Sequence, residues 1–209
     1  MQLLDGKCLI ISAGEFSDLP DDYKTWDYII ACDAGWQYAK RMGLTPDIII
    51  GDFDSSERPG DGIPVEVYPK RKDDTDTMLA AKHALEKGYR DITICCVFGG
   101  RADHMLANVQ TAAFIVSKGG WATLLGTDTR GCAFTASTKV FPRLAHHSFS
   151  VFSLSDKCTG VSIKGACYGC EDIELTNTFP LGVSNEWDSD RISVTVGSGI
   201  LLVVESRMT

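Results

Sequence analysis

Short apolar runs alternate with helical patterns through the first 125 or so residues, and this alternation limits the possible folds more than any other feature. Four β-branched runs, each closed by Gly, Asp or Ser, have the length of buried strands: residues 7–12, 27–32, 47–51 and 91–99. Helical patterns occupy the stretches between and after them: residues 34–43, 74–88 and 103–120, with Gly88 and Gly119 as expected C-terminal caps. Strands that alternate with helices predict an α/β fold with a mainly parallel sheet covered by helices.

The pattern changes after about residue 128. "HHSFSVFSLS" (146–155) alternates with period two, and "VSIKGACY" (161–168) is short and β-rich. "ISVTVGSGILLVVES" (192–206) is typical of two strands joined by a Gly-Ser-Gly turn. No long helical pattern follows residue 128. We therefore expect two domains, an α/β domain over residues 1–128 and a smaller antiparallel β domain over residues 129–209.

Charge and cysteine placement limit the classes of partner and compartment. The net charge of -8 disfavours nucleic acid or an anionic membrane surface as the main partner. No stretch has the features of a signal peptide or the length of a membrane span, so we expect a cytoplasmic protein. Four of the eight cysteines, Cys8, Cys32, Cys95 and Cys96, lie inside apolar runs, which indicates reduced thiols. The single CxxC at Cys167–Cys170 lacks a second ligand pair, so a zinc or redox site is the less favoured interpretation.

Polar residues follow each predicted strand of the first domain. Ser12 and Gly14 follow the first strand, Asp33 follows the second, Asp52 and Asp54 follow the third, and Asp103 follows the fourth within "GGRADH". Parallel sheets bind ligands at the carboxyl ends of their strands, so these groups are expected at one edge. A further acidic cluster, "KDDTD" (72–76), stands where the next helix begins.

The pair in "GDFDSS" needs a cation if its members face each other. In extended backbone Asp52 and Asp54 point to the same side, where two carboxylates about 4 Å apart repel by roughly 4 kcal/mol. Mg²⁺ is the simplest cation for carboxylates that also face phosphate oxygens. Gly99, Gly100 and Arg101 suggest a backbone and a guanidinium close to phosphates.

Ordinary structural roles are the alternative for each of these residues. Asp33, Asp74 and Asp103 suit helix N-caps, and "GDFDSS" suits a solvated loop. The chain has no Walker A sequence, no GxGxxG and no Ser-His-Asp or Cys-His arrangement. Taken together, the residues predict a metal-dependent enzyme that acts on a phosphate-bearing substrate.

Five segments in order resemble the thiamine pyrophosphokinase family: "DAG" (33–35), "PDIIIGDFDS" (46–55), "DDTDT" (73–77), "GGRADHMLAN" (99–108) and "SNEW" (184–187). The resemblance implies transfer of a pyrophosphoryl group from ATP to the thiamine hydroxyl, which yields thiamine diphosphate and AMP. It also implies Mg²⁺, a C-terminal β-sandwich and a homodimer that binds thiamine between its subunits. Other Mg²⁺-dependent phosphohydrolases or nucleotidyltransferases, and a non-catalytic thiamine or nucleotide sensor, remain alternatives.

The resemblance also implies roles for individual residues. It makes Asp52, Asp54 and Asp76 the catalytic metal ligands, with Lys72 beside them. The implied ATP site comprises Asp33, Gly99, Gly100, Arg101, Asp103, His104 and Asn108. The implied thiamine contacts are Thr75, Tyr168, Ser184, Asn185 and Trp187, the last with sandwich packing as its alternative. Two departures from the family pattern, Ala34 and the Cys-rich stretch 165–182, affect the expected detail of thiamine contact.

Overall fold

The chain folds into two compact units, Met1–Thr127 and Asp128–Thr209, in a computed structural model. The structure describes residues 3–23, 25–53, 62–69 and 71–208. The predicted metal ligand Asp54 therefore lies outside the described residues.

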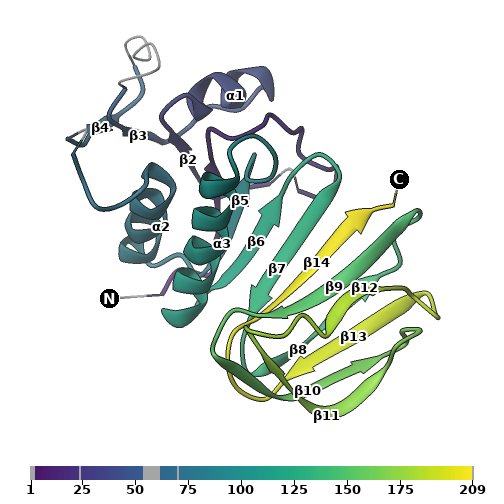
Figure 1. Ribbon diagram of the computed structural model, residues 1–209. Helices are drawn as coiled ribbons and strands as arrows, with labels where there is room; N and C mark the ends of the chain where they lie inside the picture. Colours follow the sequence, from purple (N-terminus) through teal and green to yellow (C-terminus); the bar gives the residue numbers. More distant parts are fainter. Residues whose placement is uncertain (1–2, 24, 54–61, 70, 209) are drawn as a thin grey trace. The chain divides into compact units, whose positions relative to one another are not determined.

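Unit 1 contains a parallel sheet in the strand order β6-β5-β1-β2-β3-β4 (Figure 1). Its strands are β1 (Lys7–Ile11), β2 (Tyr28–Cys32), β3 (Ile48–Gly51), β4 (Val65–Val67), β5 (Asp91–Cys95) and β6 (Trp121–Leu125). Cys8, Leu9, Ile10 and Ile11 of β1 are all fully buried, so both faces of this strand are covered. A continuous apolar run is what such a central parallel strand requires. The predicted parallel sheet is confirmed.

In the described part of unit 1, three helices cover this sheet: α1 (Gly35–Arg41), α2 (Asp76–Lys87) and α3 (Ala102–Ser117). Ala39 of α1 packs in one cluster with Leu9 and Ile11, while α2 and α3 contact each other. Gly88 ends α2 in the left-handed conformation at φ 103°, as the sequence predicted, because glycine has no Cβ to clash there. No helix within the described residues is long and apolar enough to cross a membrane.

Unit 2 is built from two antiparallel sheets, with strand orders β12-β9-β14-β7 and β11-β10-β13-β8. Its strands are β7 (Thr129–Phe134), β8 (Ser137–Pro142), β9 (His147–Ser153), β10 (Lys157–Lys164), β11 (Cys170–Thr176), β12 (Gly182–Asn185), β13 (Arg191–Val196) and β14 (Leu201–Arg207). Phe149 and Val203 from the first sheet share one buried cluster with Ile163 and Val194 from the second. This common core makes the unit a β-sandwich, as the family resemblance implied.

The Gly-Ser-Gly segment does not close a hairpin. β13 pairs with β8 and β10, whereas β14 pairs with β7 and β9. The segment therefore carries the chain from one sheet of the sandwich to the other. Alternating side chains of both strands face the shared core, so the sequence pattern is the same for a hairpin and for this crossing.

Candidate functional site

A cavity of about 670 Å³ lies at the carboxyl edge of the parallel sheet in unit 1. Segments that follow β1, β2 and β5 line it, together with the first turns of α2 and α3. The predicted residues that line it are Asp33, Lys72, Thr75, Asp76, Gly99, Gly100, Arg101, His104 and Asn108. Residues scattered over 76 positions of sequence thus meet at one edge, because parallel strands bring their carboxyl ends together.

The backbone takes unusual conformations just after the ends of β2, β3 and β5. Asp33, Phe53 and Cys96 have positive φ angles of 43°, 53° and 59°. A left-handed conformation costs a non-glycine residue about 1–2 kcal/mol, and such strain is concentrated at functional sites. Gly51 allows the close approach of two strand ends, because an added Cβ would lie 3.0 Å from the Cα of Asp33.

Two of the predicted metal ligands converge on one cationic group. The Lys72 ammonium donates to Asp76 Oδ1 at 2.6 Å and to Asp52 Oδ2 at 3.4 Å. All three side chains are largely buried, with exposed fractions between 14% and 23%. Asp52 does not line the cavity, but it accepts a hydrogen bond from Lys72, which does.

Burial and charge act on this cluster in opposite directions. Burial raises the pKa of Asp76 above its ordinary value; the Lys72 ammonium opposes this effect, and the carboxylates of Asp52 and Asp33 add to it. Burial alone would lower the pKa of Lys72, but Asp76 and Asp52 together outweigh it and raise that pKa. Burial of either charge would therefore be unfavourable without the opposite charge beside it. The cluster requires a cation, and Lys72 supplies one.

The donor set fits Mg²⁺, which binds through one or two carboxylates and leaves its other positions to water and phosphate. The convergence of Asp52 and Asp76 on a single charged atom is the observation that carries this fit. Within the described residues no three His, Cys, Asp or Glu side chains are grouped around one metal position. The predicted third ligand, Asp54, is outside the described residues.

The start of α3 and the glycines before it form another part of the cavity wall. Gly99 and Gly100 have positive φ angles of 81° and 67°. Arg101 forms a two-point ion pair with Asp103, with Nε to Oδ1 at 3.1 Å and Nη2 to Oδ2 at 2.6 Å, and this bonding lowers the pKa of Asp103. Asp103 does not line the cavity. It pairs instead with the guanidinium of Arg101, which does line the cavity.

Two lining residues have structural roles as well. Thr75 is the N-cap of α2, since its hydroxyl accepts the backbone N–H of Met78 at 3.1 Å. Asn108 is buried and donates Nδ2 to the Val97 carbonyl at 3.3 Å, which braces the loop before α3. Glu15 also lines the cavity and was missed, although it follows the first strand as Asp33 follows the second. Applying the carboxyl-edge rule to every acidic residue after a strand would have found it.

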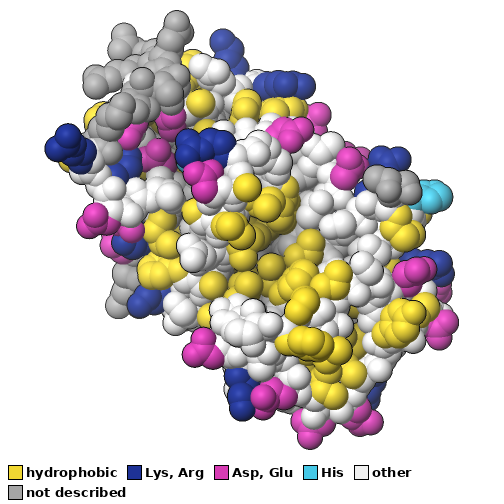
Figure 2. Space-filling view, viewed as in Figure 1, with side chains coloured by type: hydrophobic (Ala, Val, Ile, Leu, Met, Phe, Trp, Pro, Cys, Tyr) yellow, Lys and Arg dark blue, Asp and Glu magenta, His cyan; other side chains and the backbone are white. Residues whose placement is uncertain are grey.

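The predicted thiamine residues of unit 2 lie at a second cavity, of about 490 Å³. Tyr168, Ser184 and Asn185 line it with apolar side chains from β10, β11 and the segment before β12. Figure 2 shows hydrophobic side chains gathered over the strands of this unit, and Tyr168, Phe179 and Leu181 are among the exposed ones. Trp187 is only 4% exposed and packs edge-on against Phe149, so it belongs to the sandwich core.

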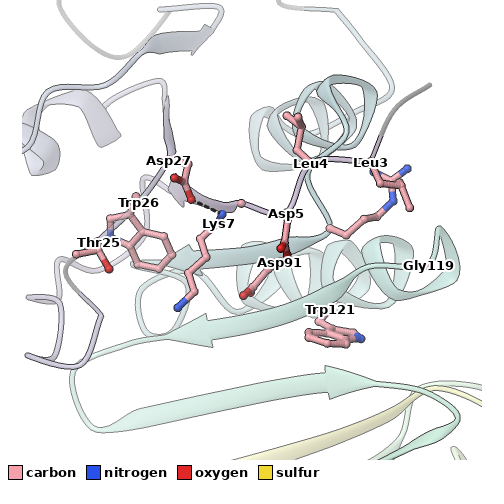
Figure 3. A pocket seen from close by; sticks show the side chains of 12 residues that line it. Leu3, Leu4, Asp5, Lys7, Thr25, Trp26, Asp27, Asp91, Gly119 and Trp121 are labelled. Carbon is pink, nitrogen blue, oxygen red and sulfur yellow. Dashed lines mark hydrogen bonds between the residues drawn. The ribbon is translucent and has the colours of Figure 1, made fainter.

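Unit 1 has another cavity, of about 550 Å³, at the amino edge of its sheet. Figure 3 shows Lys7, Asp91 and Trp121, the first residues of β1, β5 and β6, at its walls. Asp27 there accepts the backbone N–H of Lys7 at 2.8 Å. No predicted site residue lines it, and parallel sheets bind ligands at the other edge. The carboxyl-edge cavity is therefore the candidate catalytic site.

Comparison with known proteins gives a consistent result over nearly the whole chain. The model "Thiamin pyrophosphokinase, catalytic domain" matches residues 21–119, and the model "Thiamin pyrophosphokinase, vitamin B1 binding domain" matches residues 140–201. A curated thiamine pyrophosphokinase of Bacillus subtilis is 28% identical over 193 residues, which is 89% of each chain.

Solved structures agree in fold. The crystal structure of thiamine pyrophosphokinase from Bacillus subtilis superposes with a TM-score of 0.85 at 25% identity, covering 97% of this chain and 100% of that one. The enzyme from Geobacillus thermodenitrificans gives 0.81 at 22% identity, with 97% and 98% covered, and supports the fold alone. Because the two matching models describe successive domains of one family and together span more than half of the sequence, the chain belongs to the thiamine pyrophosphokinase family.

Proposed function

We propose that this chain carries out the reaction of its family, the transfer of a pyrophosphoryl group from ATP to thiamine, which yields thiamine diphosphate and AMP. Matches to both a catalytic and a vitamin B1 binding domain support the two substrates. The structural observation that carries the proposal is the convergence of Asp52 and Asp76 on one cation at the carboxyl-edge cavity. That cavity also has a glycine-rich wall and a guanidinium, which suit a triphosphate.

Unit 1 is accordingly proposed as the ATP- and Mg²⁺-binding catalytic domain. Asp52 and Asp76 would hold the ion, with Asp54 as the expected third ligand. A bound Mg²⁺ would neutralise charge on the phosphate oxygens during transfer. Arg101, paired with Asp103, and His104 also line the cavity, where they would contact phosphate oxygens. Asp33 completes the proposed nucleotide site.

The chain's own contribution to the reaction is mainly positional. The thiamine hydroxyl oxygen forms a bond to the β-phosphorus of ATP, and the bond from that phosphorus to the oxygen of AMP breaks. AMP leaves with the electron pair, and a carboxylate of the cluster accepts the hydroxyl proton. Arg101 and the backbone at Gly99 and Gly100 would keep the triphosphate in line with the hydroxyl. Lys72 would remain beside the reacting phosphates as a second positive charge.

Unit 2 is proposed as the thiamine-binding domain, with Tyr168 and Ser184 at its surface. The Tyr168 ring is 75% exposed beside an apolar cavity, which suits a flat pyrimidine by stacking and a thiazolium by cation–π attraction. We also propose a cytoplasmic homodimer that binds thiamine between its subunits. The exposed apolar side chains of unit 2 support a partner surface, and all eight cysteines, none in a disulfide, suit a reducing compartment.

Product analysis tests this function. The protein is incubated with ATP, thiamine and Mg²⁺, with a chelator in a parallel sample. We expect AMP and thiamine diphosphate, and neither product with the chelator. ADP would indicate a monophosphate kinase, free phosphate a hydrolase, and no turnover a sensor, and each of these results would overturn the proposal.

A further inference from the structure

Strand β12 contains a bulge at the cavity of unit 2. Gly182 pairs with Val151 of β9, and Asn185 pairs with Phe149. Between these two pairs β12 therefore has one more residue than β9. Ser184 takes up the extra residue in the left-handed conformation at φ 57°. A bulge of this kind redirects the side chains that follow it. Ser184 stays exposed, and Asn185 is turned into the unit, where it is 4% exposed.

The Asn185 carboxamide makes three hydrogen bonds to neighbouring backbone groups. Oδ1 accepts the N–H of Tyr168 at 3.0 Å and the N–H of Glu186 at 2.9 Å. Nδ2 donates to the carbonyl of Tyr168 at 2.9 Å. One buried side chain thus binds both backbone groups of a residue whose own ring is 75% exposed. A carboxamide engaged at both its oxygen and its nitrogen supports the backbone of its neighbours.

Two further bonds join the same turn to the same segment. Cys167 donates its N–H to the Glu186 carbonyl at 2.9 Å, and Ala166 forms an isolated bridge with Trp187. Trp187 is fixed in the core by Phe149 and donates Nε1 to the Phe141 carbonyl at 3.4 Å. The turn that carries Tyr168 is therefore held by the rigid sandwich, through residues 185–187.

We propose that Asn185 is a positioning residue for thiamine, which acts by holding the backbone of Tyr168 so that its ring faces the incoming vitamin. This inference rests on the proposed function of unit 2. A mobile turn would lose conformational entropy when thiamine binds to its ring. A turn that is already fixed in the free protein avoids that entropic cost. Removing the carboxamide should therefore raise the KM for thiamine and leave the KM for ATP unchanged.

Asn185→Asp tests the proposal with little change of volume. The carboxylate keeps both acceptor positions but removes the Nδ2 donor, so the Tyr168 carbonyl loses its partner. We expect the KM for thiamine to rise at least tenfold, while kcat and the KM for ATP stay within twofold. Asn177→Asp is the matched control, because this exposed amide contacts Asp156 elsewhere in the unit at 3.4 Å. It should leave all three constants within twofold.

A double-mutant cycle separates action through Tyr168 from any other role. Tyr168→Ala removes an exposed ring and should itself raise the KM for thiamine. Added to Tyr168→Ala, Asn185→Asp should change this KM by less than twofold, because its effect passes through the missing ring. An equal rise in both backgrounds would overturn the proposal.

Amide hydrogen exchange of the wild-type protein tests the support even if Asn185→Asp folds poorly. The Tyr168 N–H should exchange at least 100-fold more slowly than in an unfolded peptide, although its side chain is exposed. Exchange at the unfolded rate would overturn the proposal. Failure of the wild-type protein to form AMP and thiamine diphosphate would instead contradict the proposed function. A normal thiamine KM for Asn185→Asp beside a raised one for Tyr168→Ala would remove only the role of Asn185.

Discussion

Asp76 is the residue on which the proposed chemistry depends most. It is largely buried, its pKa is raised by that burial, and it shares the Lys72 ammonium with Asp52. Asp76→Asn keeps the shape of the side chain but removes the charge that would hold a metal ion. We expect turnover to fall by about two orders of magnitude, as when other transition-state charge partners are removed. Steady-state kinetics at saturating ATP, thiamine and Mg²⁺ measure this.

Asp74→Asn is the matched control for that change. Asp74 lies in the same acidic segment but pairs with Lys82 at 2.6 Å, away from the cluster. It should retain turnover within a few-fold of wild type. Equal activity in the Asp76 and Asp74 variants would remove Asp76 from the proposed metal site.

Glu205 makes the stability of unit 2 depend on pH. Burial raises the pKa of this carboxyl from 4.5 to about 7, with Arg130 opposing the shift. The folded protein therefore binds the proton more tightly than the unfolded chain does. The stability from this group is complete below pH 4.5 and is lost as pH rises through about 7, by on the order of 3 kcal/mol.

Urea unfolding of wild type and Glu205→Gln at pH 5 and pH 8 checks this prediction. Glutamine does not titrate, so the stability of wild type relative to the variant should fall between the two pH values. Glu174→Gln is the control, because Glu174 is an exposed partner of Lys157. If Glu205→Gln keeps the wild-type pH slope, Glu205 is not the group responsible.

Residue types after strands were predictable, but their partners were not. Asp76 was expected at the site from the family resemblance. The carboxyl-edge rule placed Asp33 at the same cavity because it depends only on strand direction. It said nothing of the two-point bond between Arg101 and Asp103, which depends on rotamers. Asn185 was expected among the thiamine contacts, and it lines the cavity of unit 2. Its inward orientation comes from a one-residue bulge, which leaves no pattern in the sequence.

At the scale of elements, helix α2 depends on its N-cap. Thr75 caps it through the Met78 N–H, and Asp76 adds a negative charge to the first turn. Thr75→Ala should lower the free energy of unfolding by about 1 kcal/mol, because a backbone donor loses its partner. Thr75→Ser keeps the hydroxyl and should restore most of that loss. Denaturant titration compares the two variants, and equal stability of Thr75→Ala and wild type would contradict the capping role.

The elements were predictable where burial is strong and two-sided. Four strands were recognisable in the sequence because central parallel strands are apolar on both faces: β1, β2, β3 and β5. β4 was missed, since it has three residues and its two valines are exposed. In unit 2 the alternation of β9 was visible. The pairing of β13 and β14 was not, because either partner sheet satisfies the same alternation.

At the scale of the whole molecule, we expect a homodimer. Phe179, between β11 and β12, is 66% exposed, and an apolar side chain is better covered than solvated. Light scattering on a gel-filtration column should give twice the mass of one chain. Phe179→Asp should shift the mass toward one chain, while Val140→Asp, at an exposed position of β8, should not. A single-chain mass for wild type in the presence of thiamine would contradict the dimer.

The transfer of two phosphorus atoms together is the central claim for the whole molecule. ATP labelled at the β-phosphorus tests it directly, because pyrophosphoryl transfer breaks the bond between the α- and β-phosphates. The account predicts that the label appears in thiamine diphosphate and that the AMP is unlabelled. Label retained in ADP, or released as inorganic phosphate, would contradict it.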